Sequence, residues 1–135
     1  MRHILVLLIL VSLTLVNCSD DAINGIAFQN KAEGDVIVNF RGESVEVPSG
    51  QVIQLTNIDK GEFEYETVYN IPAGATSASA EGEMSGTFSL GAGTKILVVY
   101  SSVFVEGTYT IYASVTTSED QSEDWWDNII NPINP

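Results

Sequence analysis

The stretch Gly61-Glu62-Phe63-Glu64-Tyr65-Glu66-Thr67-Val68-Tyr69 decides the fold class of this chain. Glutamate stands at positions 62, 64 and 66, whereas positions 63, 65, 67 and 69 carry phenylalanine, tyrosine, threonine and tyrosine. Successive side chains of a β-strand point to opposite faces of the sheet. The stretch therefore predicts a strand with an acidic face in solvent and an aromatic face in the core.

Alternation of the same kind continues on both sides of this stretch, and residues 23–117 carry no long stripe of helical period. Turn residues such as Pro48-Ser49-Gly50 separate the segments. Ile96–Tyr100 is continuously apolar, so we expect a strand that is buried on both faces. Residues 75–80 are all small, which fits either a flat strand or a long loop. The other expected strands lie at 26–28, 36–40, 45–47, 52–57, 84–90 and 109–115.

About seven or eight short strands, with a turn roughly every ten residues, predict an all-β fold. We expect a single antiparallel β-sandwich, with a small β-barrel as the alternative. Four segments carry characteristic strand and turn sequences: Leu55-Thr56-Asn57-Ile58, Gly61–Tyr65, Ile71-Pro72-Ala73-Gly74 and Phe88–Gly93. They resemble those of immunoglobulin-like or transthyretin-like modules of bacterial envelope proteins. The resemblance implies an adhesion, scaffold or accessory role and brings no catalytic residues.

The N-terminal residues 1–17 have the composition of a secretory signal. Arg2 and His3 form a short basic start, and the thirteen residues Ile4–Val16 are apolar except for Ser12 and Thr14. A membrane-spanning helix needs about 20 apolar residues, whereas the apolar part of a signal peptide has about 7–15. The length predicts a signal peptide that is removed.

The only cysteine of the chain follows this segment directly. Leu15-Val16-Asn17-Cys18 resembles the lipobox of bacterial lipoproteins, although Asn17 stands where a small residue is usual. The resemblance implies a diacylglycerol on the Cys18 sulfur, removal of residues 1–17 and acylation of the new N-terminus. Several acyl chains anchor a protein durably, because each buried CH₂ contributes about 0.8 kcal/mol. The alternative is a lone buried cysteine in a secreted protein.

Ser19, Asp20 and Asp21 follow the cysteine and resemble the acidic export signal of surface lipoproteins in Bacteroidota. The resemblance implies a protein held at the outer membrane of the cell envelope and facing outside the cell. The alternative is a solvated acidic linker without a sorting role. Residues 18–22 are therefore interpreted as the lipidated N-terminus and linker, and residues 23–117 as the sandwich domain.

The charge of the chain excludes nucleic acid as a partner. The chain has 5 basic and 18 acidic residues and a formal net charge of −13, and removal of residues 1–17 takes away one more basic residue. Nucleic-acid binding needs clustered Lys and Arg, which are absent here. A chain that starts at Cys18 contains no histidine, and acylation occupies its only thiol. Ser-His and Cys-His catalysis and thiolate or imidazole zinc sites are thereby excluded.

Glu62, Glu64 and Glu66 are weak candidates for a metal site, because calcium takes several oxygen ligands. No Asp-rich calcium loop accompanies them. A solvated strand face that resists edge pairing is the simpler interpretation, and we expect no cofactor. A hydrolase with two converging carboxylates stays a remote alternative, since the sequence does not single out a pair.

The C-terminal residues 118–135 differ in sequence pattern from the predicted sandwich domain. Ser118-Glu119-Asp120-Gln121 fits a capping box, and a short helix with an apolar face is expected to follow. This tail is either a lid over an open part of the sandwich or a docking element for a partner or a glycan. The four residues of that face are Trp125, Trp126, Ile129 and Ile130.

The sequence as a whole predicts a non-enzymatic outer-membrane lipoprotein, a structural or protein-interaction module held in the membrane by Cys18. Its expected partner is another envelope protein. The alternative is a glycan- or ligand-binding accessory of an outer-membrane uptake system. Its contacts would be the tail tryptophans or the aromatic face formed by Phe63, Tyr65 and Tyr69. We expect that aromatic face to lie in the core.

Overall fold

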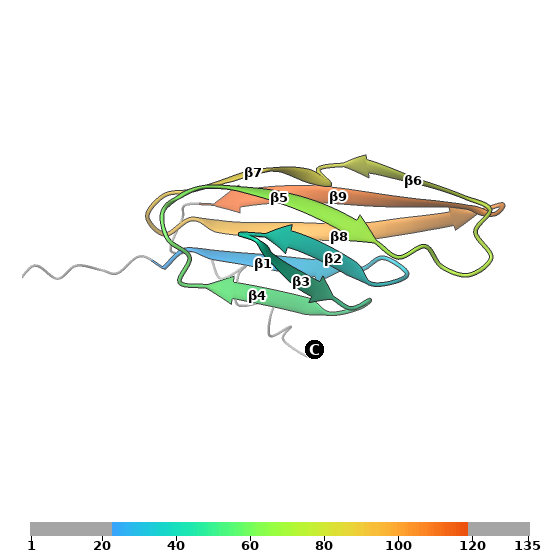
Figure 1. Cartoon of the computed structure of the whole chain (residues 1–135), viewed down its shortest axis with the longest axis horizontal. Helices are drawn as coiled ribbons and strands as arrows, with labels where there is room; N and C mark the ends of the chain where they lie inside the picture. Colours follow the sequence, from blue (N-terminus) through green and yellow to red (C-terminus); the bar gives the residue numbers. More distant parts are fainter. Residues whose placement is uncertain (1–22, 119–135) are drawn as a thin grey trace, which may run out of the picture.

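The computed structural model describes residues 23–118. Within this range the chain forms strands and turns and no helix (Figure 1). The predicted signal peptide, Cys18, the export residues and the tail residues Trp125, Trp126, Ile129 and Ile130 lie outside the described residues. The strands are β1 (Gly25–Asn30), β2 (Val36–Phe40), β3 (Glu43–Val47), β4 (Val52–Thr56), β5 (Gly61–Tyr69), β6 (Ser77–Gly82), β7 (Ser85–Leu90), β8 (Lys95–Val105) and β9 (Thr108–Ser118).

These strands form two sheets that pack face to face, which confirms the predicted β-sandwich. The five-stranded sheet has the order β4-β1-β8-β9-β6, and the four-stranded sheet has the order β3-β2-β5-β7. Most neighbouring strands are antiparallel, but β1 lies parallel to β8 and β6 lies parallel to β9. Residues 77–82 form the strand β6, so the segment of small residues is a strand and not a long loop.

The chain changes sheets between β6 and β7. β6 pairs with β9 at the edge of one sheet, and β7 pairs with β5 at the edge of the other. Gly82 allows this crossing: its φ is +84°, and a Cβ there would lie 2.2 Å from the Ala113 carbonyl oxygen. The next residue also bonds to β9, because the Glu83 carboxylate accepts a hydrogen bond from the Val115 amide at 2.7 Å.

The core lies between the sheets and consists of the inward residues of every long strand, with Phe28 among them. On β8, Ile96, Val98 and Tyr100 are almost fully buried. Leu97 and Val99 on the opposite face are only half-buried. The prediction that Ile96–Tyr100 is buried on both faces is therefore wrong for its outer positions, because the four-stranded sheet covers only the inner face of β8.

The buried polar side chains of the described part of the chain all have hydrogen-bond partners. Asn30 is fully buried, and its amide group donates to the Gly34 and Val47 carbonyls. The hydroxyls of Thr67 and Tyr100 lie 2.8 Å apart and connect the two sheets across the core. Paired polar groups of this kind avoid the cost of burying an unsatisfied donor or acceptor.

Burial raises the pKa of Tyr100 to about 12, against an opposing contribution from its hydrogen bond to Thr67. The unfolded chain has the ordinary value of 10.0. The folded state therefore holds this proton more tightly, so the stability is intact below pH 10.0 and falls between that pH and about 12. We expect a loss of up to about 2–3 kcal/mol over this range.

The absorbance of ionised tyrosine, followed against pH, tests this expectation. Tyr100→Phe should remove the phenol that titrates last and flatten the alkaline loss of stability. Tyr112→Phe is the matched control, because Tyr112 is 38% exposed. A late-titrating phenol that survives in Tyr100→Phe would show that another tyrosine is responsible.

Candidate functional site

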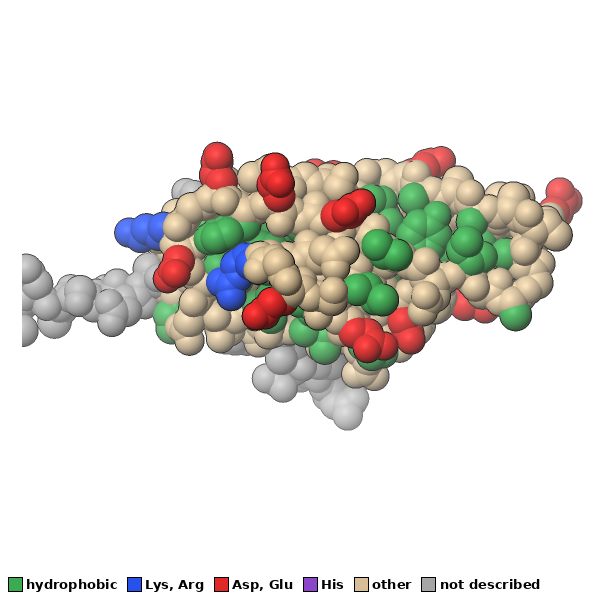
Figure 2. Space-filling model, viewed as in Figure 1, with side chains coloured by type: hydrophobic (Ala, Val, Ile, Leu, Met, Phe, Trp, Pro, Cys, Tyr) green, Lys and Arg blue, Asp and Glu red, His purple; other side chains and the backbone are tan. Residues whose placement is uncertain are grey.

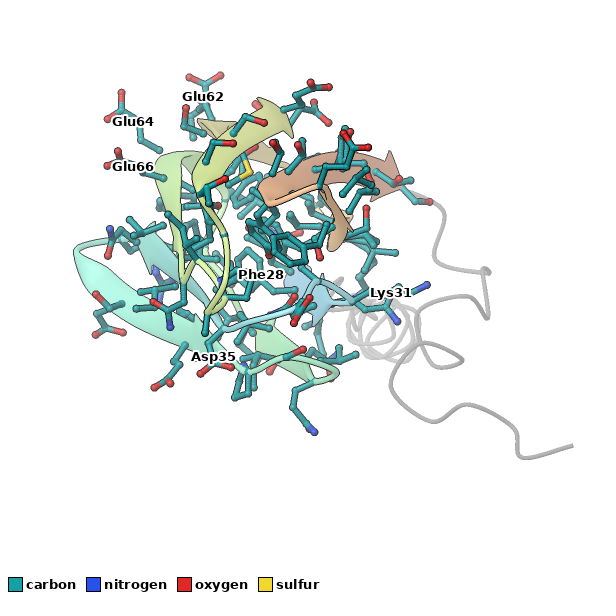
Figure 3. All side chains as sticks on the ribbon, turned by 90° about the vertical axis from the view of Figure 1, so that its right-hand side faces the viewer. Phe28, Lys31, Asp35, Glu62, Glu64 and Glu66 are labelled. Carbon is teal, nitrogen blue, oxygen red and sulfur yellow. The ribbon has the colours of Figure 1, made fainter. Side chains whose placement is uncertain are left out.

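The outer face of the four-stranded sheet carries a row of carboxylates. Glu62, Glu64 and Glu66 are exposed on β5 and project away from the core residue Phe28 (Figure 3). This confirms the alternation predicted for the stretch. The neighbouring strand β7 places hydroxyl groups opposite each of them in register, from Ser89, Thr87 and Ser85. The Ser89 hydroxyl donates to Glu62 Oε1 at 3.2 Å.

A shallow, open depression of about 510 Å³ lies on this face. Gly86 stands opposite Tyr65 in the register, and a Cβ there would lie 3.4 Å from Cε1 of the Tyr65 ring, on the core side of the sheet. Burial raises the pKa of the Tyr65 phenol, and the nearby Glu83 charge adds to the effect. The phenol therefore stays protonated and donates to the Glu83 carbonyl at 2.9 Å. The depression is lined by Asn39, Glu64, Tyr65, Glu66, Ser85, Gly86 and Thr87.

This arrangement offers hydrogen-bond acceptors and hydroxyls to a polar or cationic group in solvent. No group of three or more His, Cys, Asp or Glu residues that would hold a metal ion exists within residues 23–118. A surface that is exposed to water also weakens electrostatic attraction, because the dielectric constant there is high. The face is therefore an acidic hydrogen-bonding surface.

The aromatic face of β5 lies in the core, as predicted. The Tyr65 ring stacks on Phe88 with centroids 4.0 Å apart and planes within 4°. Phe63 meets Phe40 edge-on at 5.8 Å, and Tyr69 lies 6.1 Å from Tyr109. Since these rings are used in packing, they do not form the flat exposed platform that a sugar ring needs. These three aromatic residues are therefore not the contacts of a glycan-binding site.

The first described residues are held firmly at one end of the sandwich. The Asn24 side chain is buried, donates to the Ile58 carbonyl at 3.1 Å and accepts from the Thr94 amide at 2.7 Å. The Lys95 ammonium group donates to the Ile23 carbonyl. Cys18, the expected lipid attachment, precedes Asn24 by six residues in the sequence, and we call this end of the sandwich the anchor end.

The opposite end of the molecule exposes apolar side chains. β8 continues to Val105 and turns into β9 at Thr108, farther than the sequence predicts. Val103, Phe104 and Val105 are 49%, 43% and 57% exposed. Hydrophobic side chains also gather in Figure 2 on the side of this turn. We call the segment Val103–Val105 and its turn the tip.

Sequence reasoning missed the tip, although its signal is visible. Val103-Phe104-Val105 is an apolar run without a charge, and it stands between the expected strands 96–100 and 109–115. The expected strand Ile96–Tyr100 ends before this run. The predicted site residues Cys18, Ser19, Asp20 and Asp21 lie outside the described residues and are neither brought together nor separated here.

No protein-family model matches the sequence, and no curated protein matches it. Within residues 23–118 there is also no helix that is long and apolar enough to cross a membrane.

Proposed function

We propose that this protein is a non-enzymatic lipoprotein of the bacterial outer membrane, a β-sandwich that is displayed on a lipid anchor at Cys18. It serves as a structural or protein-interaction module, and its partner is another protein of the envelope. The observation that carries the proposal is the position of the only cysteine. It ends an apolar segment of signal-peptide length and precedes the first ordered strand by seven residues.

The shape of the domain supports this proposal. The strands run along the long axis of the molecule (Figure 1), and the eleven residues of β8 extend about 36 Å at about 3.3 Å per residue. Gly25, Lys95 and Ser118 are neighbours at the anchor end, and the turn at Glu106 lies at the other end. A lipid on Cys18 would hold one end near the bilayer and leave the tip free for contacts.

The side-chain chemistry of the domain supports a role in binding. Residues 23–118 contain neither histidine nor cysteine, so they offer no Ser-His or Cys-His pair. The depression above Tyr65 is open to solvent, whereas catalytic sites usually exclude water. The exposed acids beside it keep the domain soluble and repel other anionic surfaces.

Replacing the cysteine tests the anchor. We expect the wild-type chain to incorporate a labelled fatty acid and to sediment with the outer membrane, and Cys18→Ser to lose both properties. Asn17→Ala is the matched control, since it supplies the small residue usual before the cysteine and should keep or improve processing. Label on Cys18→Ser, or none on the wild type, would contradict the proposal. Full protection of the domain from protease on intact cells would exclude the outward orientation.

A further inference from the structure

The outer face of the five-stranded sheet has an apolar centre on β1 and β8. The four-stranded sheet packs on the inner face, so the outer side chains of these two strands point away from it. In the register of β1 and β8, Ala27 stands beside Leu97, and Gln29 stands beside Val99. Cross-strand neighbours share one face of a sheet. Ala27, Leu97 and Val99 therefore form one continuous surface, which we call the outer patch.

The outer patch is shielded, although neither sheet lies over it. Ala27 is fully buried without belonging to the core between the sheets. Leu97 and Val99 are half-buried, whereas Ser101 and Val103 are exposed farther along the same face of β8. Burial on this face is thus confined to the half nearest the anchor end. An apolar patch of this kind indicates that a further segment packs on it.

The two outer faces of the sandwich differ in charge, and this difference indicates which segment it is. The outer face of the five-stranded sheet consists mostly of serine, threonine and apolar residues, and its charged residues within 23–118 are Lys95 at the anchor end and Glu81 on the edge strand β6. An acidic segment is repelled by the face of the four-stranded sheet and not by the outer patch. The face of the four-stranded sheet carries the exposed residues Glu46, Glu62, Glu64 and Glu66.

The C-terminal tail, residues 119–135, starts at the border of this face. β9 ends at Ser118, which stands opposite Lys95 on β8, and Lys95 stands opposite Gly25 on β1. Neighbouring strands are about 4.8 Å apart, so about 10 Å separates Ser118 from β1. Trp125 follows Ser118 by seven residues, which span about 10 Å as a helix and about 23 Å when extended. Either conformation brings the tryptophan to the outer patch.

The composition of the tail also fits the outer patch. The tail contains five acids and neither Lys nor Arg, so the glutamate face repels it, while the Lys95 ammonium group lies where the tail begins. The negative charge of the chain also disfavours the tail of a second copy. A tail attached next to its site acts at a high effective concentration. Four of its apolar residues would share one face of a helix, and these are Trp125, Trp126, Ile129 and Ile130.

We propose that the tail docks on its own domain, with the face of Trp125, Trp126, Ile129 and Ile130 packed on the outer patch. The tail is then a lid over the anchor half of the five-stranded sheet, and its tryptophans are not contacts for a partner or a glycan. Partners are left with the acidic face and the tip. The docking needs no lipid, so it stands or falls separately from the anchor at Cys18.

Tryptophan fluorescence tests the docking, because Trp125 and Trp126 are the only tryptophans of the chain. The experiment uses the full chain with Cys18→Ser, so that no lipid takes part. We expect emission at a shorter wavelength, and quenching by acrylamide several-fold weaker, than in the same chain unfolded in urea. Emission and quenching equal to those of the unfolded chain would overturn the proposal. Quenching that falls as the protein concentration rises would show docking on a second copy and would also overturn it.

A charge placed in the outer patch tests where the tail docks. Leu97→Glu should raise the quenching several-fold, because it puts a carboxylate against an apolar and acidic segment. Val103→Glu is the matched control, since Val103 lies on the same face of the same strand, is 49% exposed and stands beyond the patch. It should leave the quenching unchanged. Equal quenching in the two variants, with circular dichroism showing that both keep their strands, would overturn the proposal.

Substitutions in the tail give a second test, which does not depend on the folding of Leu97→Glu because they leave the sandwich sequence intact. Ile129→Ser removes an apolar residue of the proposed contact and should raise the quenching. Ile133→Ser is the matched control, since Ile133 follows Pro132 and lies outside the expected helical face. It should leave the quenching unchanged. Equal effects of the two substitutions would contradict the docking.

Discussion

Phe88→Ala is expected to lower the free energy of unfolding by about 3–5 kcal/mol, which is the usual cost of removing a buried aromatic ring. Phe88 is only 2% exposed. Its ring stacks on Tyr65 and lies 6.3 Å from Phe28 and 5.8 Å from Phe40. It thus joins residues of both sheets, and alanine would leave a cavity that rigid strands cannot close. For a domain of this size the melting temperature should fall by about 15 °C or more.

Thr87→Ala is the matched control for this prediction, because Thr87 is the neighbouring residue on β7 and faces solvent. We expect a change within about 0.5–1 kcal/mol for it. Chemical denaturation of both variants, followed by circular dichroism, gives the comparison. A Phe88→Ala protein that is nearly as stable as the Thr87→Ala protein would show that this ring is not at the centre of the core.

Asn30→Ala should have a comparable effect through hydrogen bonds. The Asn30 amide donates to the Gly34 and Val47 carbonyls at 2.9 and 2.8 Å, and its oxygen accepts from the Ala32 amide at 2.9 Å. Alanine leaves these backbone groups without partners, and each buried unsatisfied group costs about 1–3 kcal/mol. We expect a loss of about 3–5 kcal/mol in the free energy of unfolding.

The control for Asn30 is Asn39→Ala on the outer face of β2. Asn39 is exposed and accepts one hydrogen bond from Ser44, so its loss should cost about 0.5 kcal/mol. Hydrogen exchange adds a specific readout. Asn30→Ala should expose the amide of Ala32 and those of the following loop to exchange before the rest of the domain opens. Unchanged protection of that loop would contradict the role given to Asn30.

The all-β sandwich could be predicted because it depends on local alternation. The stretch Gly61–Tyr69 shows both faces of its strand in its own sequence, and the structure confirms them. Strand pairing is different, because it depends on residues far away. The small residues of β6 gain their strand from parallel pairing with Thr108–Ala113, some thirty residues later. No pattern within 77–82 contains that information.

The candidate surfaces also differ in how far the sequence alone predicts them. The acidic row Glu62, Glu64 and Glu66 was visible in the sequence, whereas the depression beside it depends on the pairing of β5 with β7, which places Thr87 and Ser85 opposite Glu64 and Glu66. The apolar run Val103-Phe104-Val105 is visible in the sequence, but its exposure beyond the end of β1 depends on β1 stopping opposite Tyr100, which is a property of the tertiary fold.

The domain has two different ends. At the anchor end the buried Asn24 side chain donates to the Ile58 carbonyl, and at the tip Val103, Phe104 and Val105 are exposed.

The intact mass of the protein purified from outer membranes tests the central claim most directly. The account predicts a chain that begins at Cys18, with residues 1–17 removed, and an added mass equal to one diacylglyceryl group and one further acyl chain. Fragmentation should place both additions on Cys18. A mature protein that begins elsewhere, or that carries an unmodified Cys18, would contradict it.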